Sequence, residues 1–125
     1  MNSAMKVMFV DDDVINNEIN QMLFRKLYPE IEVVVKSSVD SALDYLNNPE
    51  VRNPNKIFLD INLPVKSGWD FLTEYKQLKM HGIDVYMLTS ALDLLDANKK
   101  EEHPEVKDFV EKPLYDYKLE SILSE

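Results

Sequence analysis

The 125-residue chain contains no cysteine, and this absence excludes several kinds of chemistry at once. Disulfide frameworks, cysteine-ligated zinc or iron–sulfur centres and cysteine nucleophiles all need the thiol. Long apolar runs are also missing, since no stretch approaches the roughly 20 residues that a transmembrane helix needs. No charged segment followed by an apolar one opens the chain, as a secretory signal would require. We therefore expect a cytoplasmic protein that does not bind membranes.

Basic side chains are scarce as well. The chain has 14 Lys and Arg against 23 Asp and Glu, a formal net charge of −9, and its longest basic run is Lys99-Lys100. Binding to nucleic-acid phosphates by counterion release needs a basic stripe, so the composition argues against a direct nucleic-acid partner. Hydrophobic residues nevertheless make up 45% of the chain, which is enough for a folded core.

Two hydrophobic periodicities alternate along the chain. Strand-like apolar runs occupy residues 6–10, 31–35, 56–59, 85–88 and 106–110. Apolar residues recur at helical spacing in 15–27, 39–46, 71–78, 91–95 and 115–123, and the fourth of these patterns decays into a polar run at 98–103. Strands that alternate with helices indicate a parallel sheet covered on both faces, because each crossover is right-handed. The sequence thus predicts an α/β, doubly wound, five-stranded parallel sheet of the flavodoxin-like type, with strand order 2-1-3-4-5.

This pattern fills a single domain, which we expect to span residues 5–125. Residues 1–4 precede a second methionine, Met5, and are either a native extension or a remnant of cloning. The pattern closes one helix after the last strand, so the chain is expected to hold no output domain.

Two serines mark expected helix starts. Ser67 precedes Asp70 by three residues, and Ser90 precedes Asp93 by three residues. This spacing resembles a capping box, in which the two side chains each bind the other residue's backbone N–H.

Acidic side chains follow two of the predicted strands. Function in a doubly wound sheet collects at the carboxyl ends of the strands, next to the point where strand order reverses. With neighbouring strands about 4.8 Å apart, Asp11 or Asp12 comes close to Asp60. Two unit charges 4 Å apart repel by about 4 kcal/mol at an effective dielectric of 20, which a divalent cation would relieve. Oxygen ligands without Cys or His indicate Mg²⁺ or Mn²⁺ rather than zinc.

Thr89 and Lys112 end two further strands on the same edge. Thr89 is expected one strand from Asp60, and Lys112 two strands away, a gap of roughly 10 Å that the long lysine side chain can largely close. This set suits phosphoryl transfer onto Asp60. A cation and Lys112 would neutralise phosphoryl oxygens, Thr89 would donate a hydrogen bond, and the Asp60 carboxylate would be the nucleophile.

Each feature alone also has a plain structural interpretation. The carboxylates at 11–13 can cap a helix, Thr89-Ser90 can cap another, and Lys112-Pro113 can start a loop. The functional interpretation is favoured because the topology gathers all of these features at one edge of the sheet.

Together these motifs resemble response-regulator receiver domains of two-component signalling, and the chemotaxis-type single-domain regulators in particular. The resemblance covers residues 5–125. It rests on Val10-Asp11-Asp12-Asp13, Phe58-Leu59-Asp60-Ile61-Asn62-Leu63-Pro64, Ser67-Gly68, Met87-Leu88-Thr89-Ser90-Ala91 and Phe109-Val110-Glu111-Lys112-Pro113.

The resemblance implies a (βα)5 receiver fold and a specific chemistry. Asp60 would accept a phosphoryl group from a phosphohistidine on a histidine kinase or phosphotransfer protein. Mg²⁺ would be held by Asp12, Asp60 and the backbone carbonyl of Asn62, with Asp11 acting largely through water. The phosphoryl oxygens would be bound by Thr89 and Lys112. Such a domain is no enzyme beyond its own phosphorylation and dephosphorylation.

The resemblance also implies a switch. Thr89 would move toward the phosphoryl group as Phe109 turns inward, which would alter the face formed by the fourth helix, the fifth strand and the fifth helix. An output protein would bind there, and a phosphorylation-dependent homodimer is a further possible assembly. Phe109 stands where tyrosine is frequent, so no hydroxyl hydrogen bond can accompany the switch. The Lys112-Pro113 bond is expected to be cis.

Two other functions stay open. An aspartate-nucleophile phosphohydrolase would want a second acid two residues after Asp60, where this chain has Asn62, and would need room for a substrate cap. A pseudo-receiver would act as an adaptor without phosphorylation, which the intact acidic pair, Thr89 and Lys112 argue against.

Overall fold

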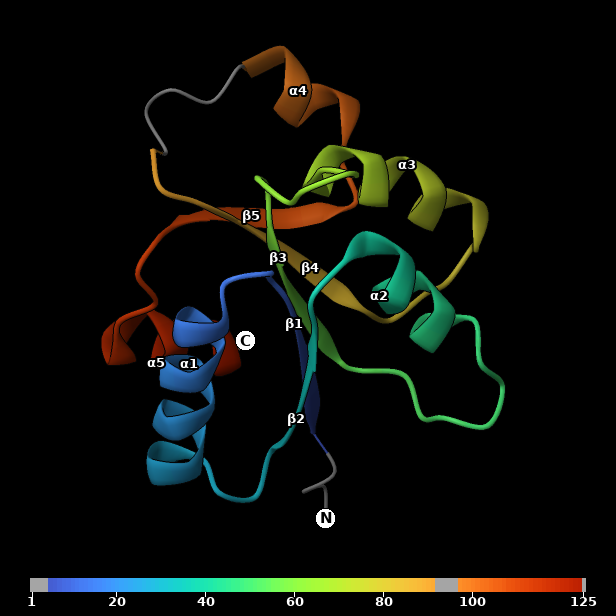
Figure 1. Cartoon of the computed structure of the whole chain (residues 1–125). Coiled ribbons are helices and arrows are strands. Elements are labelled where there is room, and N and C mark those ends of the chain that lie inside the picture. The colour runs from blue at the N-terminus through green and yellow to red at the C-terminus, as the bar shows by residue number, and fades with distance from the viewer. Residues whose placement is uncertain (1–4, 92–96, 125) are drawn as a thin grey trace.

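The structure is a computed structural model that describes residues 5–91 and 97–124. Strands and helices alternate along the chain (Figure 1). In chain order they are β1 (Lys6–Val10), α1 (Val14–Leu27), β2 (Glu32–Lys36), α2 (Val39–Leu46), β3 (Lys56–Asp60), α3 (Gly68–Gln77), β4 (Asp84–Thr89), α4 (Ala97–Glu102), β5 (Val106–Glu111) and α5 (Asp116–Leu123).

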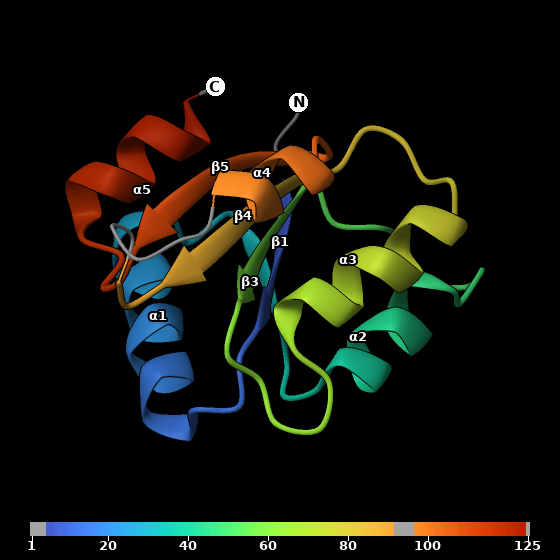
Figure 2. The ribbon, with the colours of Figure 1, turned by 90° about the horizontal axis from the view of Figure 1, so that it is seen from above.

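The strands form one parallel sheet in the order β2-β1-β3-β4-β5. This confirms the predicted doubly wound α/β fold and its strand order. Helices α2 and α3 cover one face of the sheet, and α1 and α5 cover the other (Figure 2). The order in which successive strands join the sheet reverses at β1, and the carboxyl ends of β1 and β3 lie side by side at this point.

Both faces of the sheet are packed, because alternate side chains of each central strand point to opposite sides. On the α1 and α5 side, Phe9, Phe58 and Tyr86 from three adjacent strands stack with ring centroids 4.9 Å and 5.6 Å apart. All three are fully buried. On the α2 and α3 side, Phe71 and Tyr75 stack at 5.5 Å within the second cluster. The rigid central strands thereby fix the positions of the residues that follow them.

The start of α3 forms the predicted capping box. The Ser67 hydroxyl accepts from the Asp70 N–H at 3.3 Å, and the Asp70 carboxylate accepts from the Ser67 N–H at 2.9 Å. The second expected box involves Asp93, which lies outside the described residues.

The described part of the fourth helix lies beyond the apolar pattern at residues 91–95. Ala91 is not helical, residues 92–96 lie outside the described part of the chain, and α4 occupies Ala97–Glu102. In the sequence, most of these residues belong to the polar run in which the fourth apolar pattern fades. Lysine and glutamate are good helix formers without any apolar face, and Lys99 pairs with Glu102 at 3.9 Å across one turn.

Helix α1 forms where predicted, but its apolar stripe faces solvent. Ile15, Ile19 and Met22 are 72%, 57% and 59% exposed. The side chains buried against the sheet are instead Asn17, Asn20 and Phe24. An amphipathic helix ordinarily buries its apolar stripe, so α1 is rotated relative to the expectation from its pattern.

Candidate functional site

Three carboxylates meet at the edge of the sheet where β1 and β3 end. Asp11 and Asp12 follow β1, and Asp60 is the last residue of β3. One oxygen atom from each lies within 4.8 Å of the other two. Asp11 and Asp60 are buried, whereas Asp12 is exposed to solvent. The structure therefore brings together the acidic residues that the sequence placed at this edge.

Lys112 reaches this cluster from the end of β5. Its Nζ atom lies 3.0 Å from Asp60 Oδ2 and 3.4 Å from Asp11 Oδ2. The lysine side chain thus closes the gap of two strands, as predicted. The Lys112-Pro113 peptide bond is cis, also as expected.

Backbone contacts fix the Asp60 carboxylate and the loop that follows it. Asp60 Oδ1 accepts a hydrogen bond from the Asn62 N–H at 3.1 Å. The loop then turns back on β3, since Gly68 N donates to Ile61 O at 2.8 Å. A Cβ atom on Gly68 would lie 2.7 Å from the Asp60 carbonyl oxygen and 2.9 Å from Ile61 Cα. Only glycine allows α3 to begin this close to the end of β3.

Burial dominates the electrostatics of Asp60. Desolvation raises the pKa of Asp60, the Lys112 ammonium counteracts this by hydrogen bond and charge, and the negative Asp11 adds to the increase. For Lys112, burial lowers the pKa, but the contacts with Asp60 and Asp11 outweigh it and the pKa is raised overall. Lysine therefore stays charged. Three carboxylates face one ammonium, so the cluster keeps an excess of negative charge and can hold a divalent cation with oxygen ligands.

The first turn of α1 holds Asp11 in place. Asp11 Oδ1 accepts from the Asp13 N–H at 3.0 Å, and Oδ2 accepts from Asn16 Nδ2 at 2.7 Å. Asn17 Nδ2 donates to the Asp11 carbonyl oxygen at 2.9 Å. Sequence reasoning missed both asparagines, because nothing in their spacing separates them from the solvated polar residues of a helix.

Asp13 has the capping role that the sequence left open for the acidic run. It is the N-cap of α1, and its Oδ1 accepts from the Ile15 and Asn16 N–H groups at 3.1 Å each. The capping interpretation is therefore right for Asp13, while Asp11 and Asp12 belong to the carboxylate cluster.

Thr89 and Phe109 form their described contacts with residues other than Asp60. Thr89 is buried at the end of β4, and its Oγ1 accepts from the Ala91 N–H at 3.1 Å. Among the described residues, no hydrogen bond joins the Thr89 side chain to Asp60. Phe109 is half-buried on β5, and its ring centroid lies 6.1 Å from that of Trp69 on α3.

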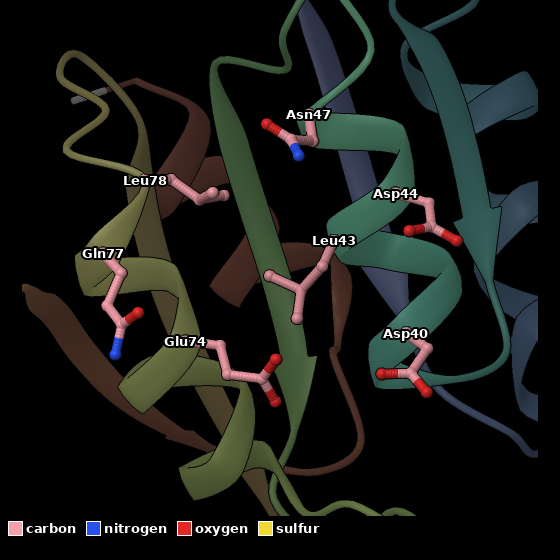
Figure 3. Close-up of a pocket in the computed structure, with 7 residues that line it drawn as sticks. All are labelled: Asp40, Leu43, Asp44, Asn47, Glu74, Gln77 and Leu78. Carbon is pink, nitrogen blue, oxygen red and sulfur yellow. The ribbon is translucent and has the colours of Figure 1, made fainter.

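A groove of about 460 Å³ lies between α2 and α3 (Figure 3). Asp40 and Glu74 line it, and Lys66 pairs with both, at 2.8 Å and 2.9 Å. Hydrogen bonds to these two carboxylates raise the pKa of Lys66. Lys66 belongs to the loop between β3 and α3, so the two ion pairs anchor this loop to both helices.

Among residues 5–91 and 97–124, none of the helices has the length and apolar character needed to cross a membrane.

Fold and strand-edge cluster together define a class of signalling domain. Residues 7–124 match the family model described as "Response regulator receiver domain", and the chain belongs to this family. Domains of this family are receivers of two-component systems, and they signal rather than act as free-standing enzymes.

Solved structures of related proteins agree with this assignment. The chain is 30% identical to a two-component response regulator from Cytophaga hutchinsonii, with a TM-score of 0.84 over 97% of this chain and 95% of that one. It is 25% identical to a two-component response regulator from Legionella pneumophila, with a TM-score of 0.82 over 96% of this chain and 95% of that one.

A curated relative matches over a shorter region. The chain is 36% identical over 64 residues to a protein-glutamate methylesterase/protein-glutamine glutaminase from Nitrobacter hamburgensis. The aligned part covers 51% of this chain but only 16% of that protein.

Proposed function

We propose that this receiver domain accepts a phosphoryl group on Asp60 from a phosphohistidine of a histidine kinase or phosphotransfer protein. An Asp60 oxygen would attack phosphorus, the phosphorus–nitrogen bond to the donor imidazole would break, and that ring would take up a proton. The observation that carries the proposal is the Lys112 ammonium 3.0 Å from the Asp60 carboxylate, inside a cluster of three carboxylates. Such fixed positive charge stabilises the phosphoryl oxygens during transfer.

Mg²⁺ is the cofactor that this cluster fits. The ligands in this proposal are Asp11, Asp12, Asp60 and the backbone carbonyl of Asn62, all of them oxygen donors. When bound, the cation would neutralise negative charge at the acceptor and on the phosphoryl group. The excess of carboxylates over ammonium groups supports this assignment.

Lys112 and Thr89 would bind the transferred group. Lys112 already contacts Asp60, so a small movement of its flexible side chain would bring it to a phosphoryl oxygen. The Thr89 hydroxyl accepts from the Ala91 N–H and keeps its own proton for donation.

Output would pass through the face formed by α4, β5 and α5. Phe109 and Lys118 line a groove of about 440 Å³ between β5 and α5. Tyr117, 63% exposed, lies in the same groove. A change in the position of Phe109 would therefore reshape a surface on which an output protein can dock.

The donor protein would dock on α1. This helix begins directly after the carboxylate cluster, and its outer side exposes Val14, Ile15, Ile19 and Met22. Contiguous exposed apolar side chains are typical of protein interaction sites. A partner that covers this stripe lies next to Asp60 without blocking it.

Incubation with Mg²⁺ and acetyl phosphate tests the proposal by intact-mass spectrometry. Wild type is expected to gain the mass of one phosphoryl group, and Asp60→Asn to gain none. Asp13→Asn is the matched control, since it removes a neighbouring charge and should still be phosphorylated. Incorporation that survives Asp60→Asn would refute the assignment of the acceptor. A protein that neither binds Mg²⁺ nor gains a phosphoryl group would be an adaptor instead.

A further inference from the structure

We infer that Asn16 is a positioning residue for the carboxylate cluster: its amide fixes the Asp11 carboxylate in the orientation that a divalent cation requires. The inference rests on the proposed acceptor function, because it concerns the cation site of that function. It adds to the site a residue that belongs to neither the carboxylates nor the strand ends.

The contact between Asn16 and Asp11 is short and partly buried. Asn16 Nδ2 lies 2.7 Å from Asp11 Oδ2, closer than Lys112 Nζ, which lies 3.4 Å from the same oxygen. The Asp11 side chain is only 3% exposed. A buried carboxylate keeps its orientation only through such donors, since water cannot replace them.

The amide and the ammonium act differently on an incoming cation. Lys112 carries a positive charge, so it repels a cation and must leave Asp11 when one binds. Asn16 is neutral, so it can hold Asp11 Oδ2 both before and after the cation arrives. Residues that hydrogen-bond to metal ligands, without touching the metal themselves, orient the ligands and raise metal affinity.

Asn17 supports the same conclusion from the backbone. It is 7% exposed, and its Nδ2 donates to the Asp11 carbonyl oxygen at 2.9 Å. Its Oδ1 is buried and has no hydrogen-bond partner among the described residues. A buried acceptor without a partner is destabilising. Two consecutive asparagines thus hold Asp11 in place, Asn16 by binding its side chain and Asn17 by binding its main chain. These contacts explain why a polar side chain, Asn17, faces inward on α1.

The test is isothermal titration of the full chain with MgCl₂. Asn16→Leu keeps the size of the side chain and removes its donor, and it should weaken Mg²⁺ binding by roughly 10-fold or more. Gln21→Leu removes a side-chain amide further along the same helix and should leave the Mg²⁺ affinity unchanged.

Bound Mn²⁺ supplies a spectroscopic readout that a general loss of stability would not move. Its electron paramagnetic resonance spectrum reports ligand arrangement, and we expect a change in Asn16→Leu but none in Gln21→Leu. If Asn16→Leu does not fold, as judged by circular dichroism, Asn16→Ala takes its place with the same expected weakening.

The outcomes separate this inference from the proposed function. Mg²⁺ affinity within twofold of wild type in a folded Asn16→Leu would overturn the inference and leave the acceptor function intact. A wild-type chain that does not bind Mg²⁺ would overturn both. Failure of phosphorylation in a wild-type chain that binds Mg²⁺ would overturn only the acceptor function.

Discussion

Replacing Asp12 with Asn is expected to stabilise the metal-free protein and to remove most of the stabilisation that Mg²⁺ provides. Asp12 is the exposed member of the carboxylate cluster, within 4.8 Å of both Asp11 and Asp60. Its charge is therefore unfavourable when no cation is bound, and favourable when one is.

The geometry sets the size of the effect. Two like charges 4.8 Å apart repel by about 0.9 kcal/mol at the dielectric of water. Asp12 is exposed, so this value applies, and its two pairs together give about 2 kcal/mol. Attraction to the nearby Lys112 ammonium offsets part of this, which leaves about 1 kcal/mol. For a chain of this length, Tm should rise by roughly 3–5 °C.

Mg²⁺ should stabilise wild type much more than Asp12→Asn. At a concentration of about 100 times its Kd, a bound ligand stabilises the folded state by about 2.7 kcal/mol. That corresponds to a Tm increase of roughly 10 °C for wild type, whereas Asp12→Asn, lacking one ligand, should gain far less. Thermal unfolding followed by circular dichroism, in EDTA and in excess Mg²⁺, measures both quantities.

Asp13→Asn is the matched control for this experiment. It makes the same change of charge one residue further on, and asparagine caps a helix as well as aspartate does. It should keep the full Mg²⁺ response. Two results would refute the reasoning: a lower Tm for Asp12→Asn than for wild type in EDTA, or equal Mg²⁺ responses of these two proteins.

Two further predictions concern Asp60 and α1. Burial raises the pKa of the Asp60 carboxyl group above its ordinary value of 3.8. The folded chain therefore binds a proton at Asp60 more tightly than the unfolded chain does, so the free energy of unfolding should fall as pH rises from about 3.8 through the raised pKa. Urea unfolding in EDTA from about pH 4 to about pH 8 should show this loss relative to Asp60→Asn, and parallel curves would contradict it. Ile19→Asp should slow phosphotransfer from a phosphohistidine protein by about tenfold or more while leaving phosphorylation by acetyl phosphate and the Tm nearly unchanged. Leu27→Asp, about 12 Å further along the helix axis, serves as its control, and equal slowing from both kinds of donor by Ile19→Asp would exclude α1 as the docking surface.

The carboxylate cluster could be predicted because topology alone brings its members together. Once strands 1 and 3 are neighbours, the residues that end them must meet at one edge, whatever the rest of the chain does. Lys112 could be included because its long side chain tolerates the distance of two strands. In the structure the Lys112 Nζ atom lies 3.0 Å from Asp60 Oδ2, so the side chain does span the two strands.

The orientation of α1 could not be predicted in the same way. Its periodicity is carried by Ile15, Ile19 and Met22, which the hydrophobic effect alone would bury. The side of α1 that faces the sheet instead carries Asn17, Asn20 and Phe24, and Asn16 and Asn17 bind Asp11. A polar contact between two chain segments leaves no trace in the spacing of apolar residues. Departures of this kind from local rules are expected where a fold carries a site.

Lys112 explains why a cluster of three carboxylates can exist before any cation arrives. Its ammonium bridges Asp60 and Asp11, so it acts as a counter-ion for the two buried carboxylates. In the proposed function, a divalent cation takes over that role at Asp11, and the weaker of the two lysine contacts, at 3.4 Å, is the one that it must replace. The contact at 3.0 Å keeps the ammonium beside Asp60, where the phosphoryl oxygens would appear. Asp11, Asp12 and Asp60 would hold the cation, and Lys112 would stay beside Asp60 to neutralise the phosphoryl oxygens.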